Sequence, residues 1–233
     1  MTNSRLYFKG NLSENLSSYL DKSQSHYIAK VMRIKEGENF SLFNNNGEWQ
    51  AKVVAIKKNI IKFIIVKKLK NIENENEIWL AFTPIKFNYL NFMIQKATEL
   101  GVTKFIPILT DRTNVRQINK ERILKIITEA SEQSNRIKLP KLEKLIKFKE
   151  FLKFYKDTNI IFGDLNSVND QLKIVNKNPL CVLVGPEGDF SEEERKNILN
   201  FKNIKPLKIN KNILRAETAA ISLISLISFK MLS

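Results

Sequence analysis

The chain has 233 residues, which is enough for one large domain or two smaller ones, each with its own apolar core. It carries 39 basic and 24 acidic residues, and the net charge of +15 favours a polyanionic partner such as nucleic acid. A single cysteine, Cys181, excludes an intramolecular disulfide, and with a single histidine it argues against a nitrogen and sulfur metal site, so we expect no metal. No stretch has the pattern of a signal peptide, and the most apolar segment, residues 219–232, is too short to span a bilayer. We therefore expect a cytoplasmic protein with no membrane contact.

The charge alone does not decide between RNA binding and a solvated lysine surface. The chain holds 31 lysines but 8 arginines, with 26 asparagines and 29 isoleucines, a composition typical of AT-rich codons whatever the function. Position is more informative than the total. Residues 1–70 hold 13 basic and 5 acidic residues, a net charge of +8, against +7 for residues 71–233. The first third carries more than half of the excess, which favours a basic N-terminal module.

Residues 1–70 have the pattern of short β segments. Residues 40–56 form two apolar runs around Asn-Asn-Asn-Gly, a strong hairpin signal, and residues 59–69 predict a further strand. Residues 23–35 predict a short helix with His26 near its start, where a surface or capping role is favoured over catalysis. These elements together are typical of a small β-barrel.

A polar stretch without apolar periodicity, residues 71–77, predicts a linker, and after it strands alternate with helices. The predicted strands are residues 78–82, 102–109, 159–162, 181–184 and 206–209. The predicted helices are residues 88–100 (ending before Gly101), 119–134 (which Asn119 can cap), 191–201 and 217–228. This alternation predicts an α/β fold with a parallel sheet covered by helices, in which ligands bind at the carboxyl ends of the strands.

Residues 183–195, LVGPEGDFSEEER, combine the end of a strand, a glycine turn and the start of a helix. Ser191 and Glu194 form a capping box, which predicts that a helix begins at Ser191. Gly185 and Gly188 predict either a positive φ or a close approach of the backbone to a ligand.

The chemistry of this loop differs from that of the usual phosphate-binding loops. It lacks the Gly-Lys-Ser/Thr of a Walker loop and the G-x-G-x-x-G of a dinucleotide fold, and Glu187 and Asp189 would repel a phosphate. An adenine-bearing ligand without a phosphate, such as S-adenosylmethionine, fits better. Taken alone, however, the loop is explained more simply as a strand-to-helix turn.

Residues 207–220, LKINKNILRAETAA, run from a strand through a loop into a nearly all-apolar helix, which should be buried. A helix cap or an ion pair explains Glu217, because the helix dipole favours a carboxylate at that end. The helix dipole does not favour a positive charge at this end, so it does not explain Arg215. We expect Arg215 to lie beside the candidate ligand loop. A third polar group, residues 130–136, closes a predicted helix and is explained almost as well by solvation of the helix end as by function.

Five stretches, in order along the chain, carry a resemblance to a known family. They are RLYF (5–8), IQKATELGV (94–102), EASEQSNR (129–136), VGPEGDFSEEE (184–194) and ILRAETAA (213–220). In this combination they resemble the ribosomal RNA small-subunit methyltransferase E family, a branch of the SPOUT methyltransferases. The matching stretches extend from the start of the chain almost to its end.

The resemblance implies a two-domain architecture and a reaction. It implies a PUA-like β-barrel that binds RNA over residues 1–70, a linker over residues 71–77, and a SPOUT methyltransferase domain with a deep trefoil knot over residues 78–233. It further implies S-adenosylmethionine as methyl donor, a homodimer, and methylation of N3 of a uridine in 16S rRNA, which we expect within the assembled 30S subunit.

The resemblance also implies site residues. The expected cofactor contacts are Leu183, Val184, Gly185, Pro186, Glu187, Gly188, Ile209, Asn210, Ile213, Leu214 and Ala216. Residues 162–166 are expected to line the same pocket, and the expected RNA contacts are Arg5, Lys86, Arg112 and Arg136. Arg215 is the expected electrostatic catalyst, because a fixed guanidinium can face the negative charge that develops on uracil. Glu217 is expected to act as the base or to orient Arg215.

Four positions depart from the family pattern. Asp189 stands where the family usually has a second glycine, and Asn210 stands where it usually has the glycine of a Leu-Gly pair. Asn135 and Phe87 stand where it often has glycine, and Phe87 leaves Lys86 alone in a turn that usually pairs a basic residue with glycine. Because asparagine tolerates left-handed backbone, we expect Asn210 to preserve the cofactor site.

Three alternatives remain at this point. A non-catalytic RNA-binding protein would bind RNA with steep salt dependence but would not bind S-adenosylmethionine. A SPOUT enzyme could instead methylate a ribose 2′-hydroxyl or a tRNA. A nicotinamide-dependent oxidoreductase is disfavoured by the missing glycine fingerprint.

Overall fold

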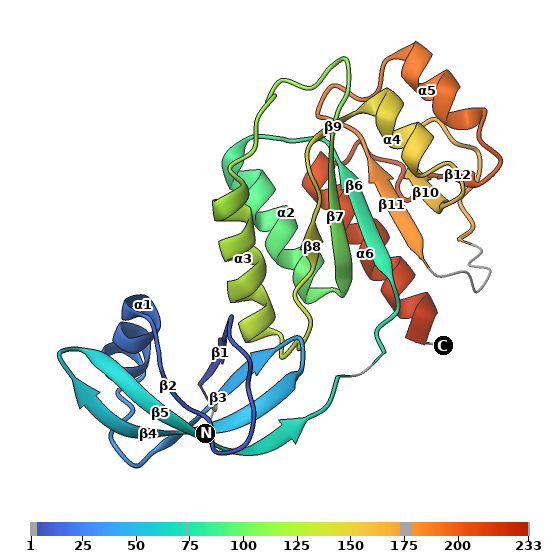
Figure 1. Ribbon diagram of the computed structural model, residues 1–233. Helices are drawn as coiled ribbons and strands as arrows, with labels where there is room; N and C mark the ends of the chain where they lie inside the picture. Colours follow the sequence, from blue (N-terminus) through green and yellow to red (C-terminus); the bar gives the residue numbers. More distant parts are fainter. Residues whose placement is uncertain (1–3, 73, 173–178, 233) are drawn as a thin grey trace. The chain divides into compact units, whose positions relative to one another are not determined.

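The computed structural model of the chain describes residues 4–72, 74–172 and 179–232 (Figure 1). Residue contacts divide the chain into two compact units. Unit 1 consists of residues 1–74 and 131–139, and unit 2 consists of residues 75–130 and 140–233. Unit 1 is therefore discontinuous in the sequence.

Unit 1 is built on a five-stranded mixed sheet. Its elements are β1 (Arg5–Tyr7), β2 (Ser17–Tyr19), α1 (Lys22–His26), the π-helical turn η1 (Tyr27–Val31), β3 (Asn39–Asn44), β4 (Gly47–Lys57) and β5 (Ile60–Lys70). The strands lie in the order β1-β3-β4-β5-β2. β1 runs parallel to β3, and the other neighbouring pairs are antiparallel.

The hairpin predicted for residues 40–56 is confirmed. Asn44 pairs with Gly47 across a two-residue turn, and Gly47 has a φ of 131°. A second two-residue turn joins β4 to β5, where Lys58 and Asn59 have φ angles of 49° and 62°. Positive φ at both central residues is the type I′ pattern. The sequence does not indicate this second turn, because Lys-Asn lacks the glycine that usually marks it.

The helix predicted for residues 23–35 forms over a shorter range, as α1 and η1. Asp21 caps its start, where the side chain accepts a hydrogen bond of 2.8 Å from the backbone N–H of Gln24. His26 is the last residue of α1 and is exposed, as a surface role requires.

An apolar cluster lies in the interior of unit 1. Phe40 and Leu42 of β3, Phe63 of β5 and Ile28 of η1 are completely buried in it. The β4–β5 ladder contains register shifts, and such irregularities bend and twist long strands. The bending allows one face of the sheet to enclose the cluster.

Unit 2 is a parallel sheet with helices. Its elements are β6 (Ile78–Phe82), α2 (Phe87–Glu99), β7 (Val102–Leu109), α3 (Lys120–Gln133, whose last residues belong to unit 1), β8 (Lys141–Leu142), β9 (Ile146–Lys147), α4 (Phe148–Phe154), β10 (Asn159–Gly163), β11 (Leu180–Val184), α5 (Glu192–Leu199), β12 (Ile204–Leu207) and α6 (Ala216–Leu232). The strand order is β12-β10-β11-β6-β7-β8, with β9 also beside β7. Every described pairing in this sheet is parallel, so the predicted α/β fold is confirmed.

Unit 2 departs from the sequence prediction mainly at β12 and at three short elements. β12 ends at Leu207 rather than at Ile209, so Lys208 and Ile209 belong to the loop that follows. β8, β9 and α4 are missed entirely, because two-residue strands and a seven-residue helix are too short for a periodic pattern.

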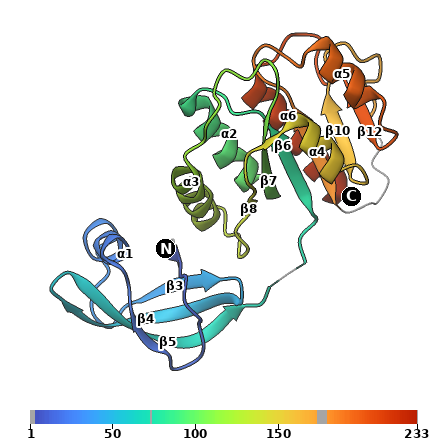
Figure 2. The ribbon, with the colours of Figure 1, turned by 45° about the horizontal axis from the view of Figure 1, so that its top comes forward.

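Helices cover both faces of the sheet of unit 2. α4 and α5 supply Phe151 and Ile198 to a buried cluster with Phe162 and Leu183 of the strands. α6 packs along β10, β11 and β6 and against α2 on the other face (Figures 1 and 2). β11 is completely buried, as a strand covered on both faces should be, and burial raises the pKa of Cys181 to about 12. Within residues 4–72, 74–172 and 179–232, no helix is both long enough and apolar enough to cross a membrane.

Candidate functional site

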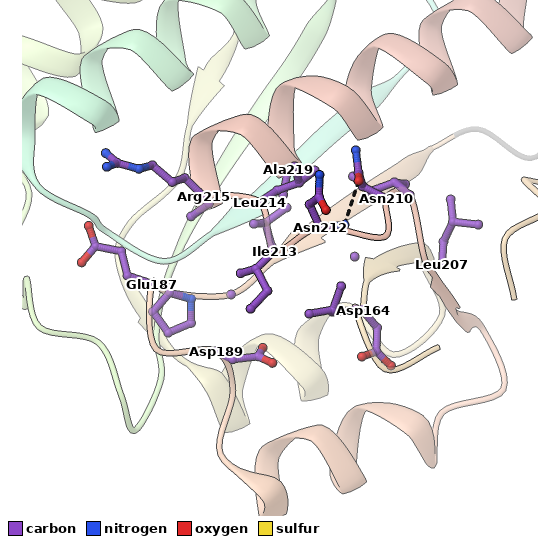
Figure 3. A pocket seen from close by; sticks show the side chains of 17 residues that line it. Asp164, Glu187, Asp189, Leu207, Asn210, Asn212, Ile213, Leu214, Arg215 and Ala219 are labelled. Atoms are coloured by element: carbon purple, nitrogen blue, oxygen red, sulfur yellow. Dashed lines mark hydrogen bonds between the residues drawn. The ribbon is translucent and has the colours of Figure 1, made fainter. Parts of the chain in front are cut away.

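Three loops at the carboxyl ends of neighbouring parallel strands surround a cavity of about 270 Å³, here called the first cavity (Figure 3). They are the β10 loop (residues 164–167), the β11 loop (residues 185–190) and the β12 loop (residues 208–215), which leads into α6. This is the edge at which parallel sheets bind ligands. The structure thus places together the two loops that the sequence singled out and the stretch expected beside them.

All of the predicted cofactor contacts line the first cavity except Leu183 and Gly188. Leu183 is fully buried in the core beneath the loop, because alternation along β11 turns it toward α4 and α5. The backbone of Gly188 instead faces the β7 loop (residues 110–114), where its carbonyl accepts a hydrogen bond of 3.0 Å from the guanidinium of Arg112.

The sequence misses several residues that line the first cavity. They are Leu207, Asn212 and Ala219, together with Asp189 and Arg215, which were assigned other roles. Gly163, Asp164 and Leu165 also line the first cavity, as expected for the stretch 162–166. Ala219 could have been found from helix geometry, because it lies one turn after Arg215 and its N–H bonds to the Arg215 carbonyl at 2.8 Å.

The β11 loop takes its positive φ at Asp189 (59°), and not at Gly185 or Gly188. The N–H of Asp189 donates to the carbonyl of Pro186 at 2.9 Å, and its Oδ1 accepts from the N–H of Phe190 at 2.8 Å. Gly185 is needed for a different reason: a Cβ there would lie 2.8 Å from the ring of Phe190. Asp189 thus takes the left-handed conformation that aspartate tolerates better than most residues.

The β12 loop contains Asn210, one of the four departures from the family pattern. Asn210 does not adopt a left-handed backbone. Its Oδ1 accepts a hydrogen bond of 2.8 Å from the N–H of Asn212, drawn as a dashed line in Figure 3. The side chain therefore shapes a turn of its own loop at the wall of the first cavity.

The predicted capping box at the start of α5 is confirmed. The N–H of Ser191 donates to Glu194 Oε2 at 3.0 Å, and the N–H of Glu194 donates to Ser191 Oγ at 3.3 Å. The other oxygen of Glu194 accepts from the N–H of Asp111, and Ser191 Oγ donates to the Asp111 carboxylate, both at 2.9 Å. These bonds fasten the β7 loop to the chain just after the β11 loop.

The β10 loop is held by an ion pair that the sequence does not reveal. Asp164 is 4% exposed, and its Oδ2 lies 2.7 Å from Nη2 of Arg195 on α5. The hydrogen bond to this carboxylate raises the pKa of Arg195. In Figure 3 the carboxyl group of Asp164 lies on the α5 side of the cavity, so it serves chiefly to position the loop.

A second cavity of about 330 Å³ adjoins the first. It is lined by Lys86, Tyr89, Glu187, Arg215 and Glu217, and it shares Glu187 and Arg215 with the first cavity. Figure 3 shows Arg215 and Glu187 together at one side of the first cavity, away from Asn210. Both residues expected to be catalytic therefore line the second cavity, and Arg215 lies where the two cavities meet.

The two expected catalytic side chains differ in burial. Glu217 is 7% exposed and lies in the first turn of α6, where the helix dipole favours a carboxylate. Arg215 is exposed, with its Cζ 5.1 Å from the centroid of the Tyr89 ring. The Tyr89 side chain, followed by the carboxylate of Glu217, raises the pKa of Arg215, so the guanidinium is charged at every physiological pH.

Arg5, one of the four expected RNA contacts, is buried. Its side chain is 5% exposed, with Nε 3.0 Å from Glu48 Oε2 and the guanidinium 3.6 Å from the centroid of the Phe43 ring. Its two terminal nitrogens donate to the carbonyls of Ser131 and Arg136, also in unit 1. Burial lowers the pKa of Arg5, and Glu48 opposes that change. This burial weighs against the expected RNA contact, and we assign Arg5 a structural role in unit 1.

The other three expected RNA contacts are more accessible. Lys86 and Arg112 are exposed, and Arg136 is half-buried. Phe87, next to Lys86, stands where the family often has glycine. The guanidinium of Arg122 packs on its ring, 3.3 Å from the centroid, so the Phe87 side chain has a partner at the start of α2. Among the residues that the structure describes, no group of three or more His, Cys, Asp and Glu side chains could hold a metal ion.

Two family profiles match the chain. One, an RNA methyltransferase domain, matches residues 72–228, and the other, an RNA methyltransferase PUA domain, matches residues 20–66. Ribosomal RNA small subunit methyltransferase E of Rickettsia conorii is 34% identical over 97% of this chain and 95% of its own length. The protein of the same name from Bacillus subtilis is 27% identical over 88% of this chain and 87% of its own length.

Solved structures have the same fold over almost the whole chain. Ribosomal RNA small subunit methyltransferase E from Neisseria gonorrhoeae, bound to S-adenosylmethionine, is 26% identical, covers 98% of both chains and has a TM-score of 0.89. A methyltransferase from Legionella pneumophila, in complex with the same cofactor, is 28% identical, covers 99% of this chain and 98% of its own, and also has a TM-score of 0.89.

Proposed function

This chain belongs to the ribosomal RNA small subunit methyltransferase E family, and on that premise we propose that it transfers a methyl group from S-adenosylmethionine to N3 of uridine 1498 in 16S rRNA. The observation that carries the proposal is the pair of adjoining cavities that share Arg215 and Glu187. A transfer reaction needs its donor and its acceptor to meet at one point. The place where the two cavities adjoin would be that point.

The residues of the first cavity fit S-adenosylmethionine. Its walls are largely apolar and include Val184, Leu207, Ile209 and Leu214, as an adenosyl group requires. Arg215 is the only basic side chain among the lining residues, whereas a phosphate-bearing cofactor would need more positive charge. Carboxylates in the lining suit a cationic ligand. Solved relatives from Neisseria gonorrhoeae and Legionella pneumophila hold this cofactor.

When bound, S-adenosylmethionine supplies a methyl group on a positively charged sulfur. The protein must then activate the acceptor. N3 of uracil carries a proton at neutral pH and becomes nucleophilic only as that proton leaves. Glu217 accepts the N3 proton, and Arg215 faces the negative charge that then spreads onto the flanking carbonyl oxygens. Because the guanidinium stays charged, it stabilises this charge without itself losing a proton.

N3 lies on the Watson–Crick edge, so the target base must be unpaired or flipped out before it reaches the second cavity. Exposed Lys86 and Arg112, and half-buried Arg136, are the residues we propose as contacts for the RNA backbone. We propose that the RNA is presented by the assembled 30S subunit and that the protein works in the cytoplasm.

We also propose a homodimer that forms through α2 and α6. These helices pack against each other, yet they expose Phe92 (49%), Leu226 (45%) and Phe229 (71%). Exposed large apolar side chains on neighbouring helices favour a protein interface. Sedimentation equilibrium tests this. We expect the wild type to have twice the mass of one chain and a Phe229→Glu variant to have the mass of one chain. A monomeric wild type would contradict the proposal.

The reaction is tested with 30S subunits from a strain that lacks the endogenous methyltransferase. The subunits are incubated with the protein and S-adenosylmethionine, and the 16S rRNA is digested and mapped by mass spectrometry. One methyl group on the uracil base of the target nucleotide is expected. A methyl group on a ribose, or on added tRNA instead, would point to another SPOUT reaction, and no methyl transfer would refute the enzymatic proposal.

A further inference from the structure

Tyr89 is an aromatic residue in an unusual place. It lies in the first turn of α2 and lines the second cavity, and 37% of it is exposed. The large aromatic side chains of the neighbouring strands behave differently: Phe82 and Phe105 are at most 1% exposed and face each other edge to face in the core. Core packing therefore does not explain why a tyrosine is present at position 89.

The surroundings of Tyr89 are charged rather than apolar. All the other residues that line the second cavity carry a charge, two of them positive (Lys86 and Arg215) and two negative (Glu187 and Glu217). The guanidinium of Arg215 lies 5.1 Å from the centroid of the Tyr89 ring. The cavity thus combines one aromatic surface with hydrogen-bond donors and acceptors of both signs.

This combination matches the chemistry of uracil. The Watson–Crick edge of uracil has a donor, N3–H, between two carbonyl acceptors. Lysine and arginine only donate hydrogen bonds, and carboxylates accept them, so Lys86 and Arg215 suit the carbonyls and Glu217 suits N3–H. Cytosine has no proton on N3 and carries an amino group in place of one carbonyl, so it would leave donors facing donors. The flat face of a base, in turn, stacks on aromatic rings.

We infer that Tyr89 is the surface on which the flipped target uracil stacks, so that its N3 edge turns toward Arg215 and Glu217. The inference rests on the proposed methyl transfer and adds a substrate contact to it. Tyr89 does not line the first cavity, so this contact is separate from cofactor binding.

The test compares Tyr89→Leu and Tyr89→Phe with the wild type in methyl transfer to 30S subunits at saturating S-adenosylmethionine. Loss of a base–aromatic stack lowers kcat/KM of Tyr89→Leu by roughly tenfold to a hundredfold, mostly through KM for the 30S subunit. Tyr89→Phe keeps the ring and therefore recovers most of the kcat/KM that Tyr89→Leu loses. Phe154→Leu is the matched control, because Phe154 is a 64% exposed aromatic on α4 that lines neither cavity. S-Adenosylmethionine affinity, measured by calorimetry, is unchanged in all three variants.

A double-mutant cycle separates stacking from mere support of Arg215. If the ring contacts the base, Tyr89→Leu raises KM by the same factor in an Arg215→Ala background. If the ring only holds the guanidinium, the effect disappears in that background, and the inference is wrong. It is also wrong if Tyr89→Leu matches the wild type, or if it weakens cofactor binding as much as methyl transfer. A wild type that transfers no methyl group at all would instead overturn the proposed function.

Discussion

The β11 and β12 loops border the same cavity, but they are held in different ways. In the β11 loop, backbone and side-chain hydrogen bonds link Asp189 to Pro186 and to Phe190, and Arg112 holds the carbonyl of Gly188. Phe190 itself is 3% exposed and belongs to the core. In the β12 loop, the described hydrogen bonds are a turn within residues 210–212, one from Lys208 to the carbonyl of Asn169, and one from the N–H of Ala219 on α6 to the carbonyl of Arg215.

The difference indicates that the β11 wall of the first cavity is already formed before a ligand binds. The β11 loop is an extension of the core and presents a fixed wall. The β12 loop includes Ile213, which lines the first cavity and yet is 85% exposed, so we expect it to become covered when the cavity fills. Substitutions at the tightly packed positions of the β11 loop should therefore change stability, whereas those in the β12 loop should change binding and catalysis with little effect on folding.

The largest expected effect lies at the end of the β12 loop. Arg215→Ala should lower the rate of methyl transfer to 30S subunits by roughly 100-fold to 1,000-fold, because it removes the group that faces the developing charge. The melting temperature should not change, because the side chain is exposed and makes no core contact. Initial rates and scanning calorimetry measure the two quantities. Full methyl transfer by this variant would refute the catalytic assignment.

The next effect lies in the β11 loop. Gly185→Ala should destabilise the protein by about 1–3 kcal/mol, because the new Cβ would lie 2.8 Å from the buried ring of Phe190. Gly188→Ala is the matched control: its Cβ would lie 3.7 Å from the nearest atom, an ordinary contact. Urea unfolding of both variants measures the difference. Equal stabilities would mean that the β11 loop is not fixed by its packing on Phe190.

A smaller effect is expected where the β11 loop is left-handed. Asp189 has a φ of 59°, so Asp189→Ala should be less stable than Asp189→Gly by about 1 kcal/mol, since a Cβ without a polar partner is disfavoured there. Both variants lose the same hydrogen bond to Phe190, so their comparison isolates the backbone term. Thermal unfolding of the two variants measures this difference in stability. An alanine variant as stable as the glycine variant would show that the backbone at position 189 is not strained.

The smallest of the expected effects lies at Asn210, in the β12 loop. Asn210→Ala removes an exposed turn-forming side chain, so the free energy of unfolding should change by less than about 0.5 kcal/mol. S-Adenosylmethionine affinity should fall, because the loop loses the turn that shapes one wall of the first cavity. Calorimetric titration and urea unfolding give both values. If this variant unfolded as readily as Gly185→Ala, the contrast between the two loops would be lost.

Much of unit 2 was predictable because its elements repeat strong local patterns. The alternation of apolar strands and amphipathic helices predicted the parallel sheet, and the capping box of Ser191 and Glu194 predicted the start of α5. β8, β9 and α4 were not predictable, since they are too short to show a period. The trefoil knot stays a prediction of the family resemblance, because a knot depends on how segments thread past each other, which hydrophobic periodicity does not encode.

The site was predictable where a motif runs along the chain and unpredictable where it depends on distant contacts. The GPEGD and LRAETA stretches identified two walls of the first cavity. Arg195 and Tyr89 were missed, because nothing in their local sequence indicates that they meet Asp164 and Arg215. The burial of Arg5 was unpredictable for the same reason: a motif arginine looks alike in sequence whether it is exposed or buried beside Glu48.

The discontinuity of unit 1 has a consequence for biosynthesis. Arg5 donates hydrogen bonds to the carbonyls of Ser131 and Arg136, and the N–H of Tyr7 donates to Glu132. A ribosome makes residues 75–130 before it reaches these partners, and until then a guanidinium that is buried in the finished protein lacks two of its acceptors. The N-terminal sheet can therefore complete its fold only when more than half of the chain has been translated. Although this module is made first, it can be finished only after residues 131–139 have been made.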